Sequence, residues 1–314
     1  MKFSNNFEYS DDNKRYYTFN YYLKEKYHSK VFKVSLNADF TCPNRDGKVG
    51  VGGCSFCNTL GSGEYAGAIT DNLIDQFNSI KEKMHVKWPE AKYIAYFQAY
   101  TNTYAPLETL KATYESFITM DNVLALAIAT RPDCLSAEII SYLDSLTDKL
   151  DIWLELGLQT THDKIAQSFN RGYDYEAFLD CINRLKDTNI KVCVHLINGL
   201  PNETKEMMIE NVQRVTRLPI DAIKIHMLHL IIDSKWGQEY LKKTWSLLSL
   251  EEYVEIVVEQ LRYLKKDIVI QRLTGDAKKE NLIAPLWTLN KTNVLNSIDK
   301  YMAKNNYKQG DLYE

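Results

Sequence analysis

Six short apolar runs recur along the chain, separated by stretches with helical periodicity. The runs are VFKVSL (31–36), YIAYF (93–97), VLALAIA (123–129), DIWLELGL (151–158), KVCVHLI (191–197) and AIKIHML (222–228). Between them apolar residues recur every three or four positions, as in Leu73, Phe77, Ile80 and Met84, which indicates amphipathic helices. The pattern therefore predicts a repeating strand–helix unit.

Nearly continuous apolar strands are typical of a parallel sheet that is covered by helices. The repeat predicts an α/β fold, but the alternation alone does not choose between an open barrel and a doubly wound sheet. In both folds ligands bind at the C-terminal ends of the strands, where the loops that lead into the helices lie. The loop that follows residues 31–36 is therefore expected at that end.

The rhythm changes after about residue 230. A helix is expected near residues 249–264, followed by a short strand in DIVIQRL (267–273) and by helical segments up to the end. No linker rich in proline, glycine or serine marks a boundary. We expect an N-terminal basic aromatic segment over residues 1–30, a strand–helix domain over 31–230, and a C-terminal helical and strand extension packed on it over 231–314.

The charge balance excludes a generic polyanion binder, because 38 Lys and Arg face 41 Asp and Glu, for a formal net charge of -3 in 314 residues. Residues 14–33 are a local exception, with six Lys or Arg against one Glu and seven aromatic residues. One interpretation is an RNA-facing segment, in which cations meet phosphates and rings stack on bases. The other is a tyrosine-rich amphipathic helix whose rings pack on the body and whose lysines are solvated.

No apolar run approaches the roughly 18–20 residues that cross a bilayer, and the N-terminus lacks the apolar region of a signal peptide. We therefore expect a cytoplasmic protein with no membrane partner. In a reducing compartment, six cysteines favour metal binding or isolated core thiols over disulfides.

Three cysteines lie in one loop. Cys42, Cys54 and Cys57 have the spacing C-x11-C-x2-C, and the stretch between the first two holds four glycines. A [4Fe-4S] cluster held by three thiolates keeps one iron open, and that position can bind S-adenosylmethionine. Electron transfer to the bound molecule then yields a 5'-deoxyadenosyl radical. The spacing predicts this chemistry.

A structural zinc is the alternative for the same loop. It would need a fourth ligand, which Asp46, His28 or His85 would have to supply. The remaining cysteines are Cys134, Cys181 and Cys193, which are dispersed without a C-x2-C pair, so a second cluster is not expected.

Several motifs resemble those of a known family. They are FKVSLNADFTCPNRDGKVGVGGCSFCN, YFQAYTNTYAP, ATRPDCL, WLELGLQTTHDKIAQSFNRGYDY, HLINGLPNET, KIHMLHLI and RLTGDA followed by APLW. Together they resemble the YtqA/YhcC-like radical S-adenosylmethionine family over residues 15–291, nearly the whole chain. This family is similar to the radical half of the Elongator catalytic subunit.

The resemblance implies a partial (β/α)6 barrel, a [4Fe-4S] cluster and S-adenosylmethionine as cofactors, and a reductant protein such as flavodoxin or ferredoxin. For members from Gram-positive bacteria it also implies tRNA as the partner. There the 5-carboxymethylaminomethyl side chain of the wobble uridine becomes 5-aminomethyl before a downstream methyltransferase acts.

The ends of the second and third strands supply candidate cofactor ligands. Gln98, with Ala99 and Tyr100 beside it, ends the second strand, where radical enzymes of this type place backbone groups against the methionine amine. Thr130 and Arg131 end the third strand. The Arg131 fork suits the methionine carboxylate or a tRNA phosphate, and its alternative is an ion pair to Asp133 or Glu155.

The fourth strand carries polar residues on one side only. Alternation puts Glu155, Gly157 and Gln159 together, opposite the leucines of the same strand. A buried carboxylate needs a polar partner. The resemblance suggests ribose hydroxyls for Glu155 and the methionine carboxylate for Arg171, while a buried pair with an arginine is the alternative for Glu155.

The fifth strand leads into NGLP (198–201), which with Glu203 resembles the adenine-contacting turn of radical enzymes. Gly199 would let the backbone approach the base. On the strand itself His195 groups with Cys193, and the sequence does not say which side faces the cofactor. Five further residues near expected strand ends receive no role: Tyr104, His226, His229, Arg272 and Asp276.

Two other functions are compatible with the sequence. One is a radical S-adenosylmethionine enzyme that acts on a small molecule or a protein. The other is a non-enzymatic RNA-binding protein in which a zinc ion staples the cysteine loop.

Overall fold

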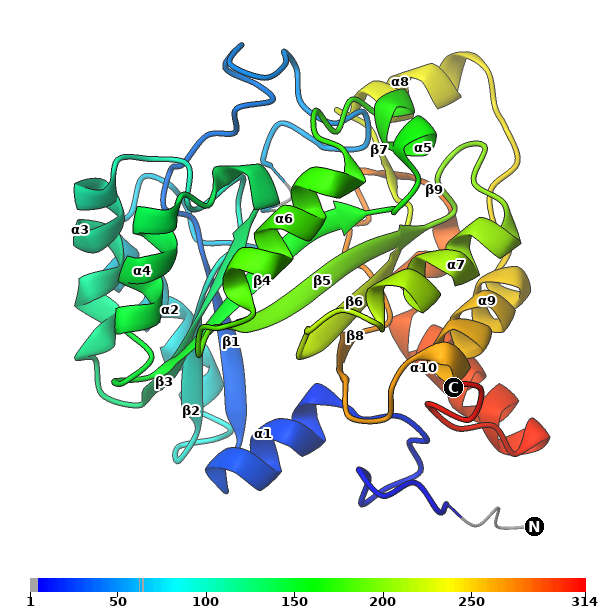
Figure 1. Ribbon diagram of the computed structural model, residues 1–314, viewed down its shortest axis with the longest axis horizontal. Helices are drawn as coiled ribbons and strands as arrows, with labels where there is room; N and C mark the ends of the chain where they lie inside the picture. The colour runs from blue at the N-terminus through cyan, green and yellow to red at the C-terminus, as the bar shows by residue number, and fades with distance from the viewer. Residues whose placement is uncertain (1–4, 62, 64) are drawn as a thin grey trace.

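Seven parallel strands form one curled sheet in the computed structural model, which describes residues 5–61, 63 and 65–314 (Figure 1). The strands are β1 (Val31–Leu36), β2 (Lys92–Phe97), β3 (Val123–Thr130), β4 (Asp151–Gln159), β5 (Lys191–Asn198), β6 (Ala222–Met227) and β8 (Val269–Arg272), in that spatial order. Each of the six predicted runs forms a strand. The α/β partial barrel with a C-terminal extension is confirmed.

The seventh strand comes from the stretch that the sequence assigns to the extension. β8 pairs in parallel with β6, with Ala222 opposite Val269 and Lys224 opposite Arg272. This pairing satisfies backbone groups that would otherwise lie open at the edge of β6. It also brings Arg272 to the same sheet as the six repeats, although the boundary expected near residue 230 stays a prediction.

The helices cover the outer face of the sheet. They are α2 (Leu73–His85), α3 (Leu107–Ile118), α4 (Ala137–Ser145), α6 (Tyr175–Leu185), α7 (Lys205–Val215), α9 (Leu250–Tyr263) and α10 (Lys291–Asn305). At the C-terminal ends of the strands lie α5 (Asp163–Ser168), α8 (Lys235–Lys242) and a small antiparallel pair, β7 (Leu230–Ile231) with β9 (Leu282–Ala284). Over the described residues, none of the helices combines the length and apolar character needed to cross a membrane.

Each strand has an apolar outer side and a different inner side. In β4, Leu154 and Leu156 pack into the main core under the helices, whereas Trp153 and Glu155 point to the concave face. Period-two alternation produces this division. The inner side is largely apolar at the N-terminal ends of the strands and polar towards their C-terminal ends, where the cysteine loop lies.

Helix α1 (Phe19–Tyr27) closes the concave face from below, at the end opposite the cysteine loop (Figure 1). The rings of Phe19 and Tyr22 both meet the Trp153 indole edge to face, with centroids 5.7 Å apart in each pair. Lys26 pairs with Asp151 at the start of β4. Of the two interpretations of residues 14–33, the structure agrees with the one in which the aromatic rings pack on the body of the protein. Lys26 and other lysines of this segment form ion pairs, however, and are not merely solvated.

The ring cluster below the sheet generates a prediction about stability. Trp153→Ala should lower the free energy of unfolding by about 3–5 kcal/mol, because the indole is 1% exposed and its loss leaves a cavity. Urea titration followed by circular dichroism measures this. Trp88→Ala is the matched control: Trp88 is 42% exposed, and its removal should cost less than about 1 kcal/mol. Equal losses in the two variants would contradict the packing role of α1.

Candidate active site

The loop after β1 brings three thiols to one cavity. The turn that carries Cys54 and Cys57 is closed by a hydrogen bond from the Cys57 amide to the Cys54 carbonyl, 2.9 Å long. The Ser55 amide donates to the Phe169 carbonyl at 2.9 Å and so anchors the turn to the end of α5. Cys42, Cys54 and Cys57 all line a cavity of about 250 Å³ at the C-terminal ends of the strands.

Polar groups of the same loop point at the sulfurs. Nη2 of Arg45 lies 3.2 Å from Sγ of Cys57, and Nδ2 of Asn44 lies 3.7 Å from Sγ of Cys54. Gly53 has φ +82°, a left-handed conformation that favours glycine, and a Cβ there would lie 2.9 Å from Nε of Arg45. These donors favour anionic sulfur.

Burial and the neighbouring Cys57 and Cys42 thiols raise the pKa of Cys54 to about 12. Such a thiol becomes a thiolate when a metal cation takes the place of its proton. Three thiols on one cavity, with cationic and amide donors behind them, therefore fit an iron–sulfur cluster.

The ligands considered for a structural zinc lie elsewhere. His28 caps the C-terminus of α1 and His85 ends α2, both at the N-terminal ends of the strands and away from the cysteine loop. Asp46 is exposed at the surface of the loop, where its carboxylate accepts a hydrogen bond from the Lys48 amide at 3.1 Å. In residues 5–61, 63 and 65–314, no three His, Cys, Asp or Glu side chains are grouped for a single ion.

The cavity gathers most of the predicted cofactor residues. Its lining includes Gln98, Thr130, Arg131, Glu155, Gln159 and Arg171. Gly199 lies outside this lining. It has φ +86°, and a Cβ there would lie 3.1 Å from a methyl carbon of Leu248, so the glycine permits close packing against the extension. Its approach to an adenine stays a prediction.

The guanidinium of Arg131 binds other groups of the protein. Nε and Nη2 donate to the two carboxylate oxygens of Asp133 at 2.9 and 2.7 Å, and Nη1 donates to the Arg171 carbonyl at 2.8 Å. This is the ion pair that the sequence offered as the alternative. Contact with a methionine carboxylate would require this fork to open, and it stays a prediction.

Arg171 is 1% exposed, and its guanidinium also binds groups of the protein. Nη1 donates to the carbonyls of Leu158 and Thr160 at 2.8 and 2.6 Å, and Nη2 lies 3.1 Å from the Asp163 carboxylate. Nε donates to the Tyr173 carbonyl at 2.9 Å. The guanidinium therefore ties the end of β4 to the loop before α6, and its role towards the methionine carboxylate is untested.

Glu155 lies at the centre of a charged network on the concave face. Its carboxylate accepts hydrogen bonds from Lys33 of β1 and Lys224 of β6, and it lies 3.1 Å from Nε2 of His195 on β5. The alternative of a buried pair is therefore realised with lysines rather than with an arginine. Neither lysine was predicted from the sequence, although both lie on the inner side of their strands.

The protonation states of this network follow from burial and charge. Burial opposes ionisation of Glu155, but Lys224 and Lys33 outweigh it and hold its pKa well below the usual range. Burial lowers the pKa of Lys224 to about 8, and burial with the Lys224 charge lowers that of His195 to about 4. At neutral pH the network thus holds one carboxylate, two ammonium groups and a neutral imidazole.

Local contacts fix the conformations of two other predicted residues, Thr130 and Gln159. The Thr130 hydroxyl lies 2.6 Å from that of Thr103, which donates to the Cys134 carbonyl at 2.7 Å. Gln159 has φ +64°, and a Cβ on Gly157 would lie 2.6 Å from its Nε2. The glycine therefore lets the Gln159 amide fold back over β4 inside the cavity.

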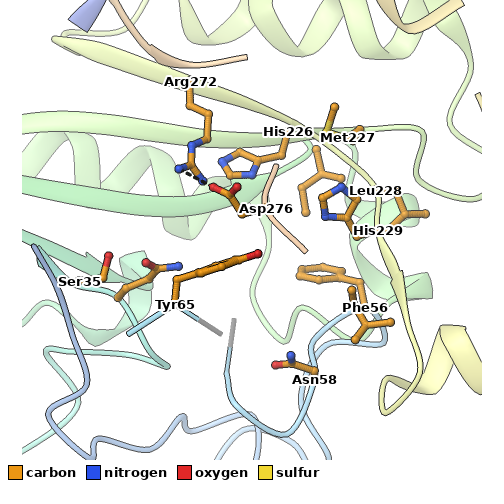
Figure 2. Close-up of a pocket in the computed structure, with 13 residues that line it drawn as sticks. Ser35, Phe56, Asn58, Tyr65, His226, Met227, Leu228, His229, Arg272 and Asp276 are labelled. Carbon is orange, nitrogen blue, oxygen red and sulfur yellow. Dashed lines mark ion pairs between the residues drawn. The ribbon is translucent and has the colours of Figure 1, made fainter. Parts of the chain in front are cut away.

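A second chamber of about 190 Å³ adjoins the first and shares Arg272, His226, Gln98, Phe56 and Ile197 with it. His226, His229, Arg272 and Asp276 all line this chamber, and Figure 2 shows Arg272 paired with Asp276 there. The sequence singled out these four residues without a role. Tyr104, the fifth, is absent from the described lining of both chambers and has Lys48 over its ring, 5.3 Å from the centroid.

Comparison with known proteins assigns the chain to a family. The model of the Radical SAM superfamily matches residues 44–215, and that of the Radical_SAM C-terminal domain matches residues 220–304. The chain is 45% identical to YtqA of Bacillus subtilis (strain 168) over 314 residues, covering all of this chain and 98% of YtqA. It is 34% identical to YhcC of Escherichia coli (strain K12), covering 89% of this chain and 90% of YhcC.

Two further similarities are more distant. A tRNA uridine(34) acetyltransferase of Methanocaldococcus jannaschii is 26% identical over 189 residues, covering 59% of this chain and 34% of that protein. The solved structure of archaeal Methanocaldococcus infernus Elp3 with an N-terminal deletion superimposes with a TM-score of 0.66 at 19% identity, covering 90% of this chain and 64% of that one. This likeness supports the half-barrel fold.

The fold, the family models and the close relatives define the class: the chain is a radical S-adenosylmethionine enzyme. Within this superfamily it belongs to the YtqA/YhcC-like family. Members of the superfamily bind a [4Fe-4S] cluster and S-adenosylmethionine, so these are the cofactors of this chain.

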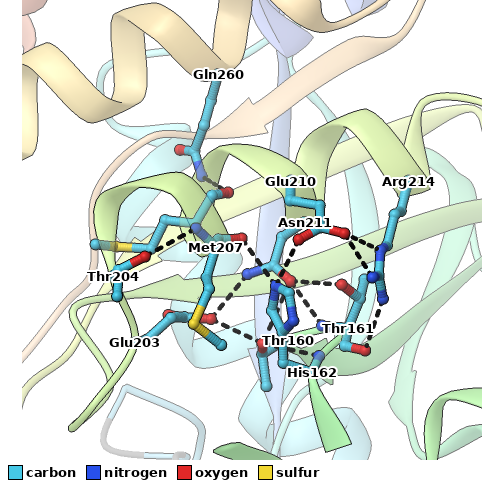
Figure 3. Close-up of polar contacts among 11 residues, drawn as sticks. Thr160, Thr161, His162, Glu203, Thr204, Met207, Glu210, Asn211, Arg214 and Gln260 are labelled. Atoms are coloured by element: carbon cyan, nitrogen blue, oxygen red, sulfur yellow. Dashed lines mark hydrogen bonds and ion pairs between the residues drawn. The ribbon is translucent and has the colours of Figure 1, made fainter.

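Glu203 holds the loop after β5 through a buried network (Figure 3). Its Oε1 accepts hydrogen bonds from the Thr160 hydroxyl at 2.7 Å and from Nδ2 of Asn211 at 2.9 Å. Oε2 is buried and has no partner in the described part of the chain. Burial raises the pKa of Glu203 to about 7.

The raised pKa of Glu203 should make the stability of the protein depend on pH. A folded-state pKa near 7, above the unfolded value of about 4.5, means that the native protein binds the proton more tightly, so stability should fall as pH rises between these values, by about 3 kcal/mol in all. Glu203→Gln keeps both accepted hydrogen bonds without a charge, so it should abolish this slope and exceed the wild type in stability near neutral pH.

Urea unfolding from about pH 5 to about pH 8 measures this difference. The exposed Glu206→Gln serves as the control and should leave the slope unchanged. A gap between wild type and Glu203→Gln that is independent of pH would show that the Glu203 carboxyl is already ionised at the acid end.

Proposed function

We propose that Cys42, Cys54 and Cys57 hold the [4Fe-4S] cluster and that the cavity above β2–β5 binds S-adenosylmethionine. The observation that carries this assignment is the meeting of the three thiols of one loop in a cavity lined by strand-end residues such as Gln98 and Gln159. When bound, the two cofactors together supply a 5'-deoxyadenosyl radical that abstracts hydrogen from an unactivated carbon.

The residues of the chain prepare this cavity in three ways. Arg45 and Asn44 donate hydrogen bonds towards the sulfurs and stabilise their negative charge. Arg131 and Arg171 fix the loops after β3 and β4 and so shape the wall of the cavity. The network around Glu155 forms a floor with one unit of excess positive charge, which favours anionic groups in the cavity.

We further propose that the substrate is tRNA and that the enzyme converts the 5-carboxymethylaminomethyl side chain of wobble uridine to 5-aminomethyl. The family resemblance of the motifs and the similarity to a tRNA uridine(34) acetyltransferase support this substrate. Oxidation of the linkage between the amine nitrogen and the carboxymethyl carbon, with S-adenosylmethionine as the two-electron oxidant, followed by addition of water, would break this C–N bond. The nitrogen stays on the uridine and gains a hydrogen, and the carboxymethyl group leaves as glyoxylate. A reductant such as flavodoxin or ferredoxin would supply electrons, and a methyltransferase would act on the product.

The RNA-contacting surface is then expected around the mouth of the cavity rather than at residues 14–33. The rings of this segment pack below the sheet, and Lys33 points into the barrel to Glu155. A small-molecule or protein substrate is the competing proposal for the same chemistry.

The assignment of the three cysteines as cluster ligands can be tested directly by substitution. Cys54→Ala should lose the iron and sulfide of the reconstituted protein and all formation of 5'-deoxyadenosine, since no other group in the loop replaces this thiolate. Iron analysis and liquid chromatography measure the two quantities. Cys134→Ala is the matched control, because this thiol lies in the turn Pro132–Cys134 outside the cysteine loop, and it should retain both. Retention of iron by Cys54→Ala would refute the assignment.

The substrate is tested by an anaerobic reaction of the reconstituted protein with reductant, S-adenosylmethionine and tRNA that carries the 5-carboxymethylaminomethyl group. We expect 5-aminomethyluridine in the nucleoside digest, with 5'-deoxyadenosine formed alongside, both read by mass spectrometry. The released two-carbon fragment reports the redox balance: glyoxylate marks oxidative cleavage and acetate marks reductive cleavage. Formation of 5'-deoxyadenosine without any change in the nucleoside would keep the radical enzyme and discard this substrate.

A further inference from the structure

Two cations share one carboxylate in the second chamber. Nη2 of Arg272, at the end of β8, lies 2.8 Å from Oδ2 of Asp276. The other carboxylate oxygen, Oδ1, contacts the ammonium of Lys291 at the start of α10. This trio therefore carries one unit of positive charge that no acidic side chain in the described residues pairs with.

Arg272 differs from the other arginines of the two chambers. Arg131 and Arg171 are occupied by carboxylates and backbone carbonyls, and Arg45 donates to Cys57. Within the described part of the chain, Asp276 is the one acceptor that Arg272 contacts, so the rest of its guanidinium is available to a ligand. It lines both chambers and therefore lies at their junction.

Two imidazoles complete the wall of this chamber (Figure 2). The Nε2 atoms of His226 and His229 are buried and have no hydrogen-bond partner in the described residues. Burial and the charge of Lys291 lower the pKa of His229 to about 4, and burial with the charge of Arg272 holds that of His226 well below its usual range. Both rings are thus neutral, and a ligand with acceptor oxygens would satisfy an Nε2–H where that tautomer is present.

We infer that this chamber is a carboxylate subsite, in which Arg272 binds the substrate carboxylate, Lys291 adds charge from behind Asp276, and His226 and His229 offer further hydrogen bonds. The inference rests on the proposed function, since the 5-carboxymethylaminomethyl side chain ends in the required group. Asp276 holds the two cations together and lowers the net charge of the subsite. The carboxylate end would bind at the junction, with the adjoining carbon towards the cofactor cavity.

The first test compares two anticodon stem–loops that differ only at the end of the wobble side chain, one carboxylate and one carboxamide. With the cluster-loaded enzyme and S-adenosylmethionine, the wild type should bind the carboxylate form about tenfold more tightly by fluorescence anisotropy. Arg272→Gln should reduce this preference to about one, whereas Asp276→Asn should increase it, because it removes the competing negative charge.

The opposite effects of these two substitutions separate binding from structure, since a merely structural trio would lose function with either change. Lys300→Gln is the matched control: it removes the same charge from an exposed position of α10, and the preference should stay at the wild-type value. Equal binding of the two stem–loops by the wild type would overturn the subsite, even if the enzyme converts the nucleoside.

A second test needs no RNA and separates the subsite from the proposed reaction. Saturation-transfer NMR should detect N-methylglycine but not N-methylglycinamide on the wild type, and neither on Arg272→Gln. A positive result here with no conversion of the tRNA nucleoside would discard the proposed function and keep the subsite. Equal signals from the two small probes on the wild type, or signals that Arg272→Gln does not change, would overturn the subsite.

Discussion

The carboxylate of Glu155 joins strands from both halves of the curled sheet. It accepts hydrogen bonds from Lys33 on β1 and Lys224 on β6, and Lys33 also donates to Gln271 on β8 at 2.7 Å. A buried charge is tolerated only when it is paired and hydrogen-bonded, so these strands must curl far enough to bring the ammonium groups to one point. This tie separates the apolar lower layer of the concave face from the polar cavity above it.

The lower layer gives the cavity a rigid base. Helix α1 places Phe19 and Tyr22 against Trp153, and the small side chains of Ala125 and Ala127 leave room for these rings. The cysteine loop and the second chamber lie at the opposite end of the barrel, at the C-terminal ends of the strands.

Arg131, Arg171 and Arg272 differ in how their guanidinium groups are engaged at the C-terminal ends of the strands. Arg131 and Arg171 donate to backbone carbonyls and so hold the loops after β3 and β4, which are the loops that must stay fixed if a radical is to act on one carbon only. Arg272 comes from β8, and in the described part of the chain its guanidinium contacts one acceptor, the Asp276 carboxylate.

The sequence by itself determined the six strands of the repeat, the polar and apolar sides of β4, and the loop that carries Cys42, Cys54 and Cys57. These features depend on local periodicity and on spacing along the chain, and for that reason they can be read without the fold. Likewise, alternation alone grouped Glu155 with Gln159 on one side of β4.

Only the tertiary structure decided the partners of these residues. Lys33 and Lys224 meet at Glu155 because the sheet curls, and β8 becomes the seventh strand because the edge of β6 needs hydrogen-bond partners. Arg272 and Lys291 reach Asp276 from a strand and a helix of the extension. Such contacts join segments far apart in the chain, and their geometry depends on how strands and helices pack, which no local pattern of residues specifies.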